Sequence, residues 1–178
     1  MSDLSAQYRA LARYNTWMNE RLYAVSANLP DAVRNEDRGA FFRSIHGTLN
    51  HILLADRAWL GRFTRVRELA ESRDAGGRPI PLTGRHDQEL YADFEVLRGE
   101  RARTDAAIEA WAATLDGERL AAPFTYKTMR GDPCEHPLWW AATHFFNHQT
   151  HHRGQLTTLL SQQGLDPGVT DLIALLRA

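Results

Sequence analysis

The pattern of apolar and polar positions divides the chain into four long amphipathic segments. Between residues 3 and 29 the apolar side chains recur at alternating steps of three and four, which is the spacing of one face of an α-helix. Similar stripes occupy residues 44–63, 86–115 and 138–163, and Pro30 ends the first of them. The sequence therefore predicts four long helices.

The segments between these helices differ in composition. Residues 31–43 are polar and irregular, and the aromatic pair Phe41 and Phe42 is expected to anchor them to the helices. Residues 65–85 are charged and rich in glycine and proline, which indicates a surface connection and not a linker between domains. Residues 171–178 predict a short apolar helix or docking segment.

Residues 118–135 have a different pattern from the helices. Phe124 and Tyr126 alternate with polar residues, and the turn signal Arg130-Gly131-Asp132-Pro133 follows. This pattern predicts a short β-hairpin or extended excursion before the last long helix. The fold class expected is all-α, a four-helix bundle with this excursion, and the 178 residues are expected to form a single domain, 1–178.

Half of the chain's eight histidines lie in the last long helix. His144, His148 and His152 are four residues apart and so share a face, together with apolar residues that must pack inward, whereas Arg153 is expected to point the other way. Two imidazoles at positions i and i+4 can bind one ion from adjacent turns, which makes His148 and His152 candidate metal ligands. The alternative is that they are core histidines hydrogen-bonded to their neighbours.

A third ligand must come from another helix, because two histidines on one helix cannot surround an ion. His51 is the best candidate, since it lies inside the second helix, where a rigid backbone can hold its direction. Its small neighbours, including Ala55 and Ala58, indicate either close helix packing or a wall that leaves room around the imidazole. His144 is expected to hydrogen-bond to this site, with a fourth ligand or a proton shuttle as alternatives.

Three neutral nitrogens leave at least one coordination position open, which is typical of a catalytic and not of a structural metal site. Zinc and nickel are favoured, and iron, copper and manganese are alternatives that affinity alone does not exclude. A metal ion would be needed for function and not for folding, because a chain of this length buries an ordinary core without it.

Charge and cysteine content exclude several other classes of protein. The formal net charge is −1 and no basic run is present, which argues against a nucleic-acid-binding surface. Cys134 is the only cysteine, so the chain has no disulfide framework and no thiolate metal cluster, in keeping with a reducing cytosol. No apolar run is long enough to cross a bilayer, and a cytoplasmic protein without a membrane partner is expected.

Asn15, the polar residue in the first apolar stripe, is expected to fix the register against another helix.

Three motifs carry a resemblance to a known family. They are YNTWMNERLY in the first helix, SIHGTLNHILLADRAWL in the second and HFFNHQTHHRGQLTTLLSQQGLDPGVTDL at the end. In these motifs the chain resembles the DinB-like (YfiT-like) metalloenzymes. The resemblance implies a four-helix bundle, a homodimer and a divalent ion held by His51 of TLNHIL and by His148 and His152 of NHQTHH.

Members of the wider superfamily use low-molecular-weight thiols such as bacillithiol or mycothiol in transferase or isomerase reactions. The resemblance therefore implies a metal-dependent enzyme, a thiol-dependent transferase or a hydrolase, acting on a small-molecule substrate. The alternative is a non-catalytic protein that binds a metal or ligand during stress. The family name refers to induction by DNA damage and does not imply nucleic-acid binding.

Overall fold

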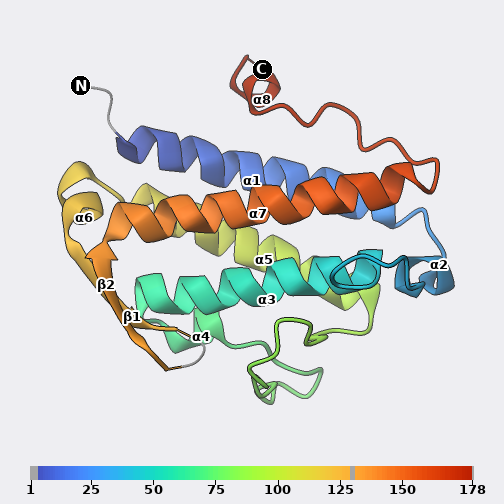
Figure 1. Cartoon of the computed structure of the whole chain (residues 1–178), viewed down its shortest axis with the longest axis horizontal. Coiled ribbons are helices and arrows are strands. Elements are labelled where there is room, and N and C mark those ends of the chain that lie inside the picture. The colour runs from blue at the N-terminus through green and yellow to red at the C-terminus, as the bar shows by residue number, and fades with distance from the viewer. Residues whose placement is uncertain (1–3, 129–130, 178) are drawn as a thin grey trace.

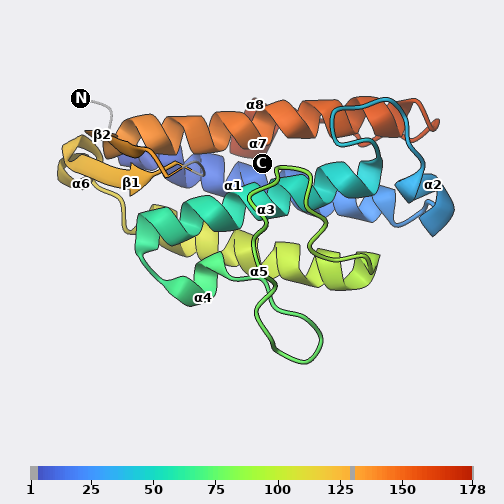
Figure 2. The same ribbon diagram turned by 60° about the horizontal axis from the view of Figure 1, so that its bottom comes forward.

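The four long helices lie side by side along the length of the molecule (Figure 1). The computed structural model describes residues 4–128 and 131–177. Within these residues the long helices are α1 (Leu4–Ser26), α3 (Ile45–Thr64), α5 (Phe94–Ala113) and α7 (Leu138–Ser161). Helices α1 and α3 each pack against both α5 and α7, so that the four form a closed ring of neighbours, as the tilted view also shows (Figure 2).

Shorter elements connect and flank the long helices. They are α2 (Asp31–Asn35), α4 (Arg67–Ala70), α6 (Gly117–Ala121), α8 (Leu172–Arg177) and the strands β1 (Pro123–Lys127) and β2 (Pro133–Pro137). The strands pair antiparallel, with Phe124 opposite His136, and so form the predicted hairpin. The chain is mostly helical with a small two-stranded sheet, so the expected all-α class is corrected by the presence of paired strands in the predicted excursion.

None of the helices in the described part of the chain combines the length and apolar character needed to cross a membrane.

The third long helix begins later than its apolar pattern predicted. It starts at Phe94 and not near His86, because Asn50 of α3 holds the preceding segment out of helical geometry. The Asn50 side-chain oxygen accepts hydrogen bonds from the backbone N–H groups of Leu90 and Tyr91, both at 2.9 Å. These donors serve α3 and not a helical turn, so residues 86–91 form part of a loop that crosses the outer face of α3.

The segment of residues 31–43 is less irregular than predicted, because it contains α2. The two phenylalanines that end it behave differently. Phe42 is buried with 5% of its surface exposed, whereas Phe41 is 79% exposed. Of these two rings, only that of Phe42 anchors the segment to the helices, and it lies against the histidines described below.

Two apolar clusters fill the interior, one toward each end of the long helices. The first is built around Phe63, Trp111 and Phe145, and the second around Leu22, Leu53 and Leu160. A layer of buried polar residues lies between them, because each long helix carries polar side chains in its middle. The residues of this polar layer are Asn15, Asn19, Asp56, Arg101, Asp105, Gln149 and Arg153.

Arg101 of α5 is the centre of this polar layer. Its guanidinium donates to the carboxylate of Asp56 at 2.6 Å and forms an ion pair with Asp105 at 2.7 Å. Asn15 donates to the same Asp105 at 2.7 Å, which agrees with its predicted role as a register-fixing contact. Arg153 was predicted to point outward, but it is only 3% exposed and donates to the amide oxygen of Asn15.

Candidate metal centre

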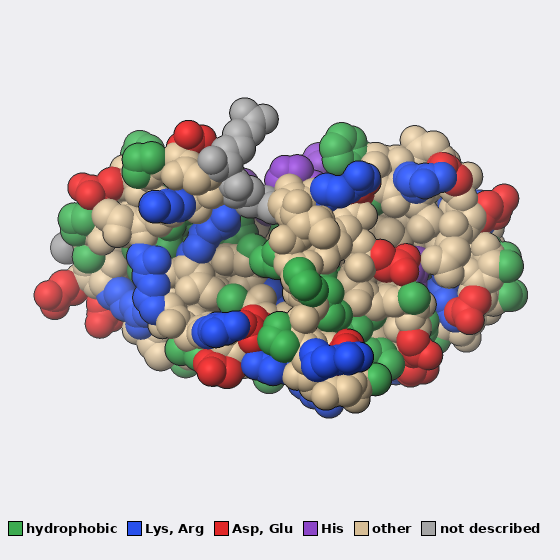
Figure 3. All heavy atoms as spheres, turned by 90° about the horizontal axis from the view of Figure 1, so that it is seen from below, with side chains coloured by type: hydrophobic (Ala, Val, Ile, Leu, Met, Phe, Trp, Pro, Cys, Tyr) green, Lys and Arg blue, Asp and Glu red, His purple; other side chains and the backbone are tan. Residues whose placement is uncertain are grey.

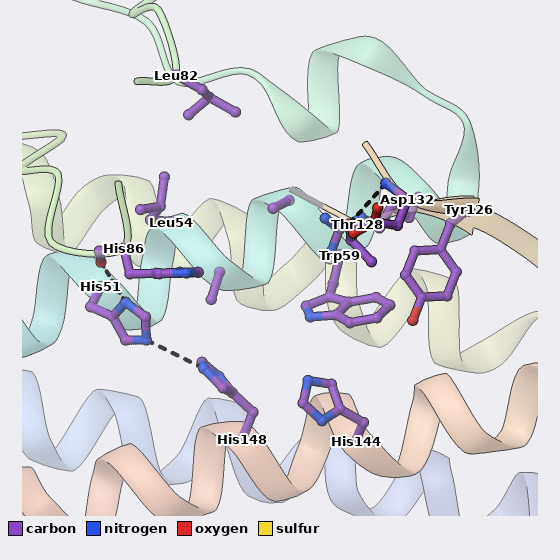
Figure 4. A pocket seen from close by; sticks show the side chains of 13 residues that line it. His51, Leu54, Trp59, Leu82, His86, Tyr126, Thr128, Asp132, His144 and His148 are labelled. Atoms are coloured by element: carbon purple, nitrogen blue, oxygen red, sulfur yellow. Dashed lines mark hydrogen bonds between the residues drawn. The ribbon is translucent and has the colours of Figure 1, made fainter. Parts of the chain in front are cut away.

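Three imidazoles from two helices meet beside the polar layer. His148 and His152 lie one turn apart on α7, and His51 faces them from α3. The Nε2 atom of His51 lies 3.3 Å from that of His148 and 3.3 Å from that of His152, and the last two are 3.1 Å apart. Figure 4 shows His51 and His148 pointing toward one another between the two helices. We call these three residues the histidine triad.

The size of this triangle fits a metal ion. Nitrogen ligands about 2.0–2.1 Å from a tetrahedral ion lie about 3.3 Å from one another. The observed separations of 3.1–3.3 Å match that spacing, with each residue offering one ring nitrogen. A divalent ion bound to all three would retain an open position, since no fourth histidine, cysteine or carboxylate joins the group among the described residues.

Hydrogen bonds on the outer nitrogens direct lone pairs into the triangle. Nδ1 of His51 lies 2.7 Å from the backbone carbonyl oxygen of His86, which can only accept, so the proton is on Nδ1. Nδ1 of His152 lies 2.8 Å from the side-chain oxygen of Gln155, which places its proton in the same way. Both Nε2 atoms are then acceptors, and they face each other without a proton between them. A metal ion satisfies such lone pairs, and outer-nitrogen hydrogen bonds of this kind are usual for histidine ligands.

Burial keeps the triad neutral. Removal from water, to which the neighbouring imidazoles add, lowers the pKa of His51 to about 4 and that of His148 to about 3. Burial also lowers the pKa of His152. Neutral imidazoles with free lone pairs are therefore available at pH 7, which is the state that binds metal.

Two residues that support the triad were not recognised from the sequence. The ring of Phe42 stacks on His51 with centroids 3.7 Å apart and meets His152 edge-on at 5.3 Å. Gln155 follows His152 by three residues on α7, a spacing that places both on one face and could have indicated their contact. The carbonyl of His86 comes from a loop, and no periodic signal marks such a contact.

The remaining histidines of α7 lie outside the triangle. His144 is exposed, its ring lies 5.9 Å from that of His148 and 5.3 Å from that of Trp59, and no hydrogen bond among the described residues joins it to the triad. His151 is exposed and accepts a hydrogen bond from the Gln155 amide at 3.2 Å. The histidine face of α7 thus runs from the surface at His144 to the interior at His152, and the expectation that it faces wholly inward is wrong for His144.

The family of the chain follows from comparison with known proteins. The model of the DinB family matches residues 1–178. The chain belongs to the DinB family. The resemblance inferred from the three sequence motifs is thereby confirmed.

Two relatives show how far the likeness extends along the chain. Protein DinB of Bacillus subtilis (strain 168) is 24% identical to this DinB-family chain over 172 residues, which are 96% of this chain and 92% of that protein. The crystal structure of a DinB-like protein from Bacillus cereus ATCC 10987 has a TM-score of 0.60 and 21% identity, and the match covers 88% of this chain and 91% of that one. At this identity the second likeness shows a shared fold alone.

A cavity opens directly beside the triad of this DinB-family protein. Its volume is about 560 Å³, and its lining includes His51 and His148 at one end and Tyr126 of the hairpin at the other. Figure 4 shows these two ends, with His144 and Trp59 between them. Figure 3 shows the face of the molecule that carries the loop before α5. Histidine side chains, coloured purple, reach the surface at the upper edge of this face.

The walls of the cavity settle the meaning of the small residues that follow His51. Ala55 and Ala58 line the cavity, together with Leu54 and Trp59. Of the two interpretations of these small residues, the wall that leaves room beside the imidazole is therefore correct. A ligand in this space would meet apolar surface on its sides and the triad at its end.

Proposed function

We propose that this DinB-family protein is a metal-dependent enzyme, a thiol-dependent transferase or a hydrolase, in which His51, His148 and His152 hold one divalent ion. The observation that supports this most is the meeting of three Nε2 atoms, 3.1–3.3 Å apart, at the end of a cavity. Three neutral nitrogens suit zinc or nickel best, with iron, copper and manganese as alternatives. The family further implies a single four-helix-bundle domain that forms a homodimer, and we include both in the proposal.

The side chains around the site would have separate tasks. A divalent ion supplies Lewis acidity, which favours the deprotonated form of a water molecule or thiol in its open coordination position. The His86 carbonyl and the Gln155 amide hold the tautomers of the ligands, and Phe42 shields two of the three rings from water. Partial removal from water at the cavity wall and the nearby Arg62 lower the pKa of His144, so this ring is neutral at pH 7 and can accept a proton from a group in the cavity.

Metal content tests the ligand set. We expect protein purified without a metal-affinity tag to carry one divalent ion per chain by elemental analysis. His51→Ala, His148→Ala and His152→Ala should each lose that ion while keeping the helical circular dichroism spectrum. His136→Ala is the matched control, because it removes an imidazole of the hairpin, outside the triad and the cavity. Metal retained in all three triad variants would refute the proposed site.

Turnover separates an enzyme from a binding protein. Metal-loaded protein is screened against pairs of low-molecular-weight thiols and electrophiles and against chromogenic esters. Consumption that depends on the ion, and that His144→Ala lowers about a hundredfold without loss of metal, would support the enzyme. Stoichiometric metal with no turnover on any pair would favour the non-catalytic alternative.

A further inference from the structure

The cavity beside the triad has a second polar end on the same helix. His51, Ala55, Ala58 and Arg62 follow one another on α3 at steps of four, three and four, and all four line the cavity. Eleven residues make three turns of helix with about 20° to spare, so Arg62 lies on the face of His51, about 16 Å further along the axis. The two alanines between them form an apolar floor.

Arg62 is held in place by aromatic rings. Its guanidinium carbon lies 4.6 Å from the centroid of Trp59 and 5.4 Å from that of Tyr126, and the side chain is half-buried. Such contacts use the flat face of the guanidinium and leave its N–H groups free to donate in the plane. They fix the position of the charge without neutralising it.

No acidic side chain in the described part of the chain pairs with those donors. Among residues 4–128 and 131–177, Arg62 takes part in none of the ion pairs or hydrogen bonds, although Arg57 on the same helix pairs with Glu100. The one carboxylate in the described lining of the cavity belongs to Asp132, which accepts a hydrogen bond from the Thr128 hydroxyl at 3.2 Å. A half-buried arginine without a carboxylate is unusual, because its desolvation is not compensated. Burial accordingly lowers the pKa of Arg62, although the group remains charged at pH 7.

We propose that the cavity binds an elongated small molecule whose carboxylate pairs with Arg62 and whose opposite end reaches the histidine triad. A planar carboxylate matches the paired N–H groups of a guanidinium, and the apolar floor and walls fit an alkyl body between the two ends. The volume of about 560 Å³ is in the range of small-molecule sites. The part concerning Arg62 stands on its own, whereas the part concerning the triad rests on the proposed function.

Calorimetry on the metal-free protein tests the Arg62 end by itself. We expect octanoate to bind at least about tenfold more tightly than 1-octanol, because a hydrogen-bonded charge pair replaces a neutral contact. Arg62→Gln should abolish this preference and leave 1-octanol binding unchanged, and Arg62→Lys should restore part of it. Arg65→Gln is the matched control, since Arg65 is exposed one turn further on and lies outside this cavity. Equal binding of the two ligands to the native protein, or a preference that survives in Arg62→Gln, would overturn the proposal.

A second experiment tests whether one molecule spans both ends. Cobalt(II)-loaded protein is titrated with mercaptoalkanoates of increasing length and with the mercaptoalcohols of the same lengths, and the thiolate-to-metal absorption is recorded. The advantage of the carboxylate should peak at one intermediate length and vanish in Arg62→Gln. An advantage independent of length would refute the spanning ligand. Absence of any absorption change with every thiol would refute the open coordination position in the proposed function, whereas the calorimetry would still decide the role of Arg62.

Discussion

Two groups of buried polar side chains lie next to each other on α3 and α7, and they differ in how their charges and lone pairs are matched. The first is the ionic layer around Arg101, in which Asp56 and Asp105 each pair with the guanidinium and Gln149 donates to Asp56 at 3.0 Å. The second is the histidine triad. Gln149 directly follows His148 in the sequence, so the two groups share the same turns of helix.

The ionic layer is closed in the sense that its charges are matched, whereas the triad is open. Each charge in the layer meets an opposite charge or an amide inside the protein, as buried charges require. In the triad, the protons of His51 and His152 point outward to oxygen acceptors, so that lone pairs converge with at most one proton, that of His148, to share. Closed networks hold helices in register, whereas convergent unsatisfied atoms beside a cavity are typical of ligand sites.

The largest expected effect tests the closed group. Arg101→Met should lower the free energy of unfolding by about 3–5 kcal/mol, because it leaves the carboxylates of Asp56 and Asp105 buried without their common partner. Urea denaturation followed by circular dichroism measures this loss.

Arg103→Met is the matched control on the same helix. The side chain of Arg103 is 76% exposed and pairs with Glu100 at the surface, where such a pair contributes at most about 1 kcal/mol. If Arg101→Met cost no more than Arg103→Met, the layer around Arg101 would not be the structural centre of the molecule.

The sequence predicted the open group better than the closed one. His148 and His152 were found because both lie on one helix, where a spacing of four determines a common face. His51 followed from its position inside the second long helix, α3, where a rigid backbone can hold its direction. The four long helices were found from the period of their apolar residues, and only the start of the third was misplaced. The residue that delays this start, Asn50, belongs to α3, so the spacing of apolar residues within 86–115 carries no sign of it.

The closed group could not be assembled from the sequence, because its partners lie on different helices. Asp56 and Arg101 are 45 positions apart, and no local pattern states that α3 and α5 face each other at that level. Arg153 was placed on the face of the helix that points away from the histidines. Its position, four residues after Gln149 and three before Leu156, lies on the inward stripe of α7, and the Asn15 acceptor that makes its burial tolerable belongs to α1.

The pH dependence of stability provides a smaller effect that tests the open group. The folded pKa values of His51 and His148, about 4 and about 3, lie below the value of about 6.5 in an unfolded chain. Between pH 6.5 and pH 4 the unfolded chain therefore binds protons that the folded chain does not. The free energy of unfolding of metal-free protein should fall as the pH is lowered through this window, by at most about 1.4 kcal/mol per pH unit for each histidine.

The control for this prediction compares the pH profiles of the free energy of unfolding of two proteins, because one profile alone contains contributions from other groups. Burial raises the pKa of Asp105 to about 6, which acts in the opposite direction, since the folded chain then takes up a proton before the unfolded one. Subtracting the profile of His148→Gln from that of the native protein removes this shared contribution. Superimposable profiles would show that His148 is not held neutral by the fold.

The smallest expected effect concerns the residue that keeps the triad open. Gln155 accepts the Nδ1 proton of His152 at 2.8 Å and thereby leaves the lone pair on Nε2 inside the triangle. Gln155→Ala frees the ring to rotate or to change tautomer, and we expect about a tenfold loss of metal affinity, measured by competition with a chromophoric chelator. Thr158→Ala, which changes an exposed side chain one turn further along α7, should bind metal as the native protein does. Equal affinities in the two variants would mean that packing against Phe42, and not the hydrogen bond, orients His152. The contrast between a closed and an open group would then rest on His51 alone.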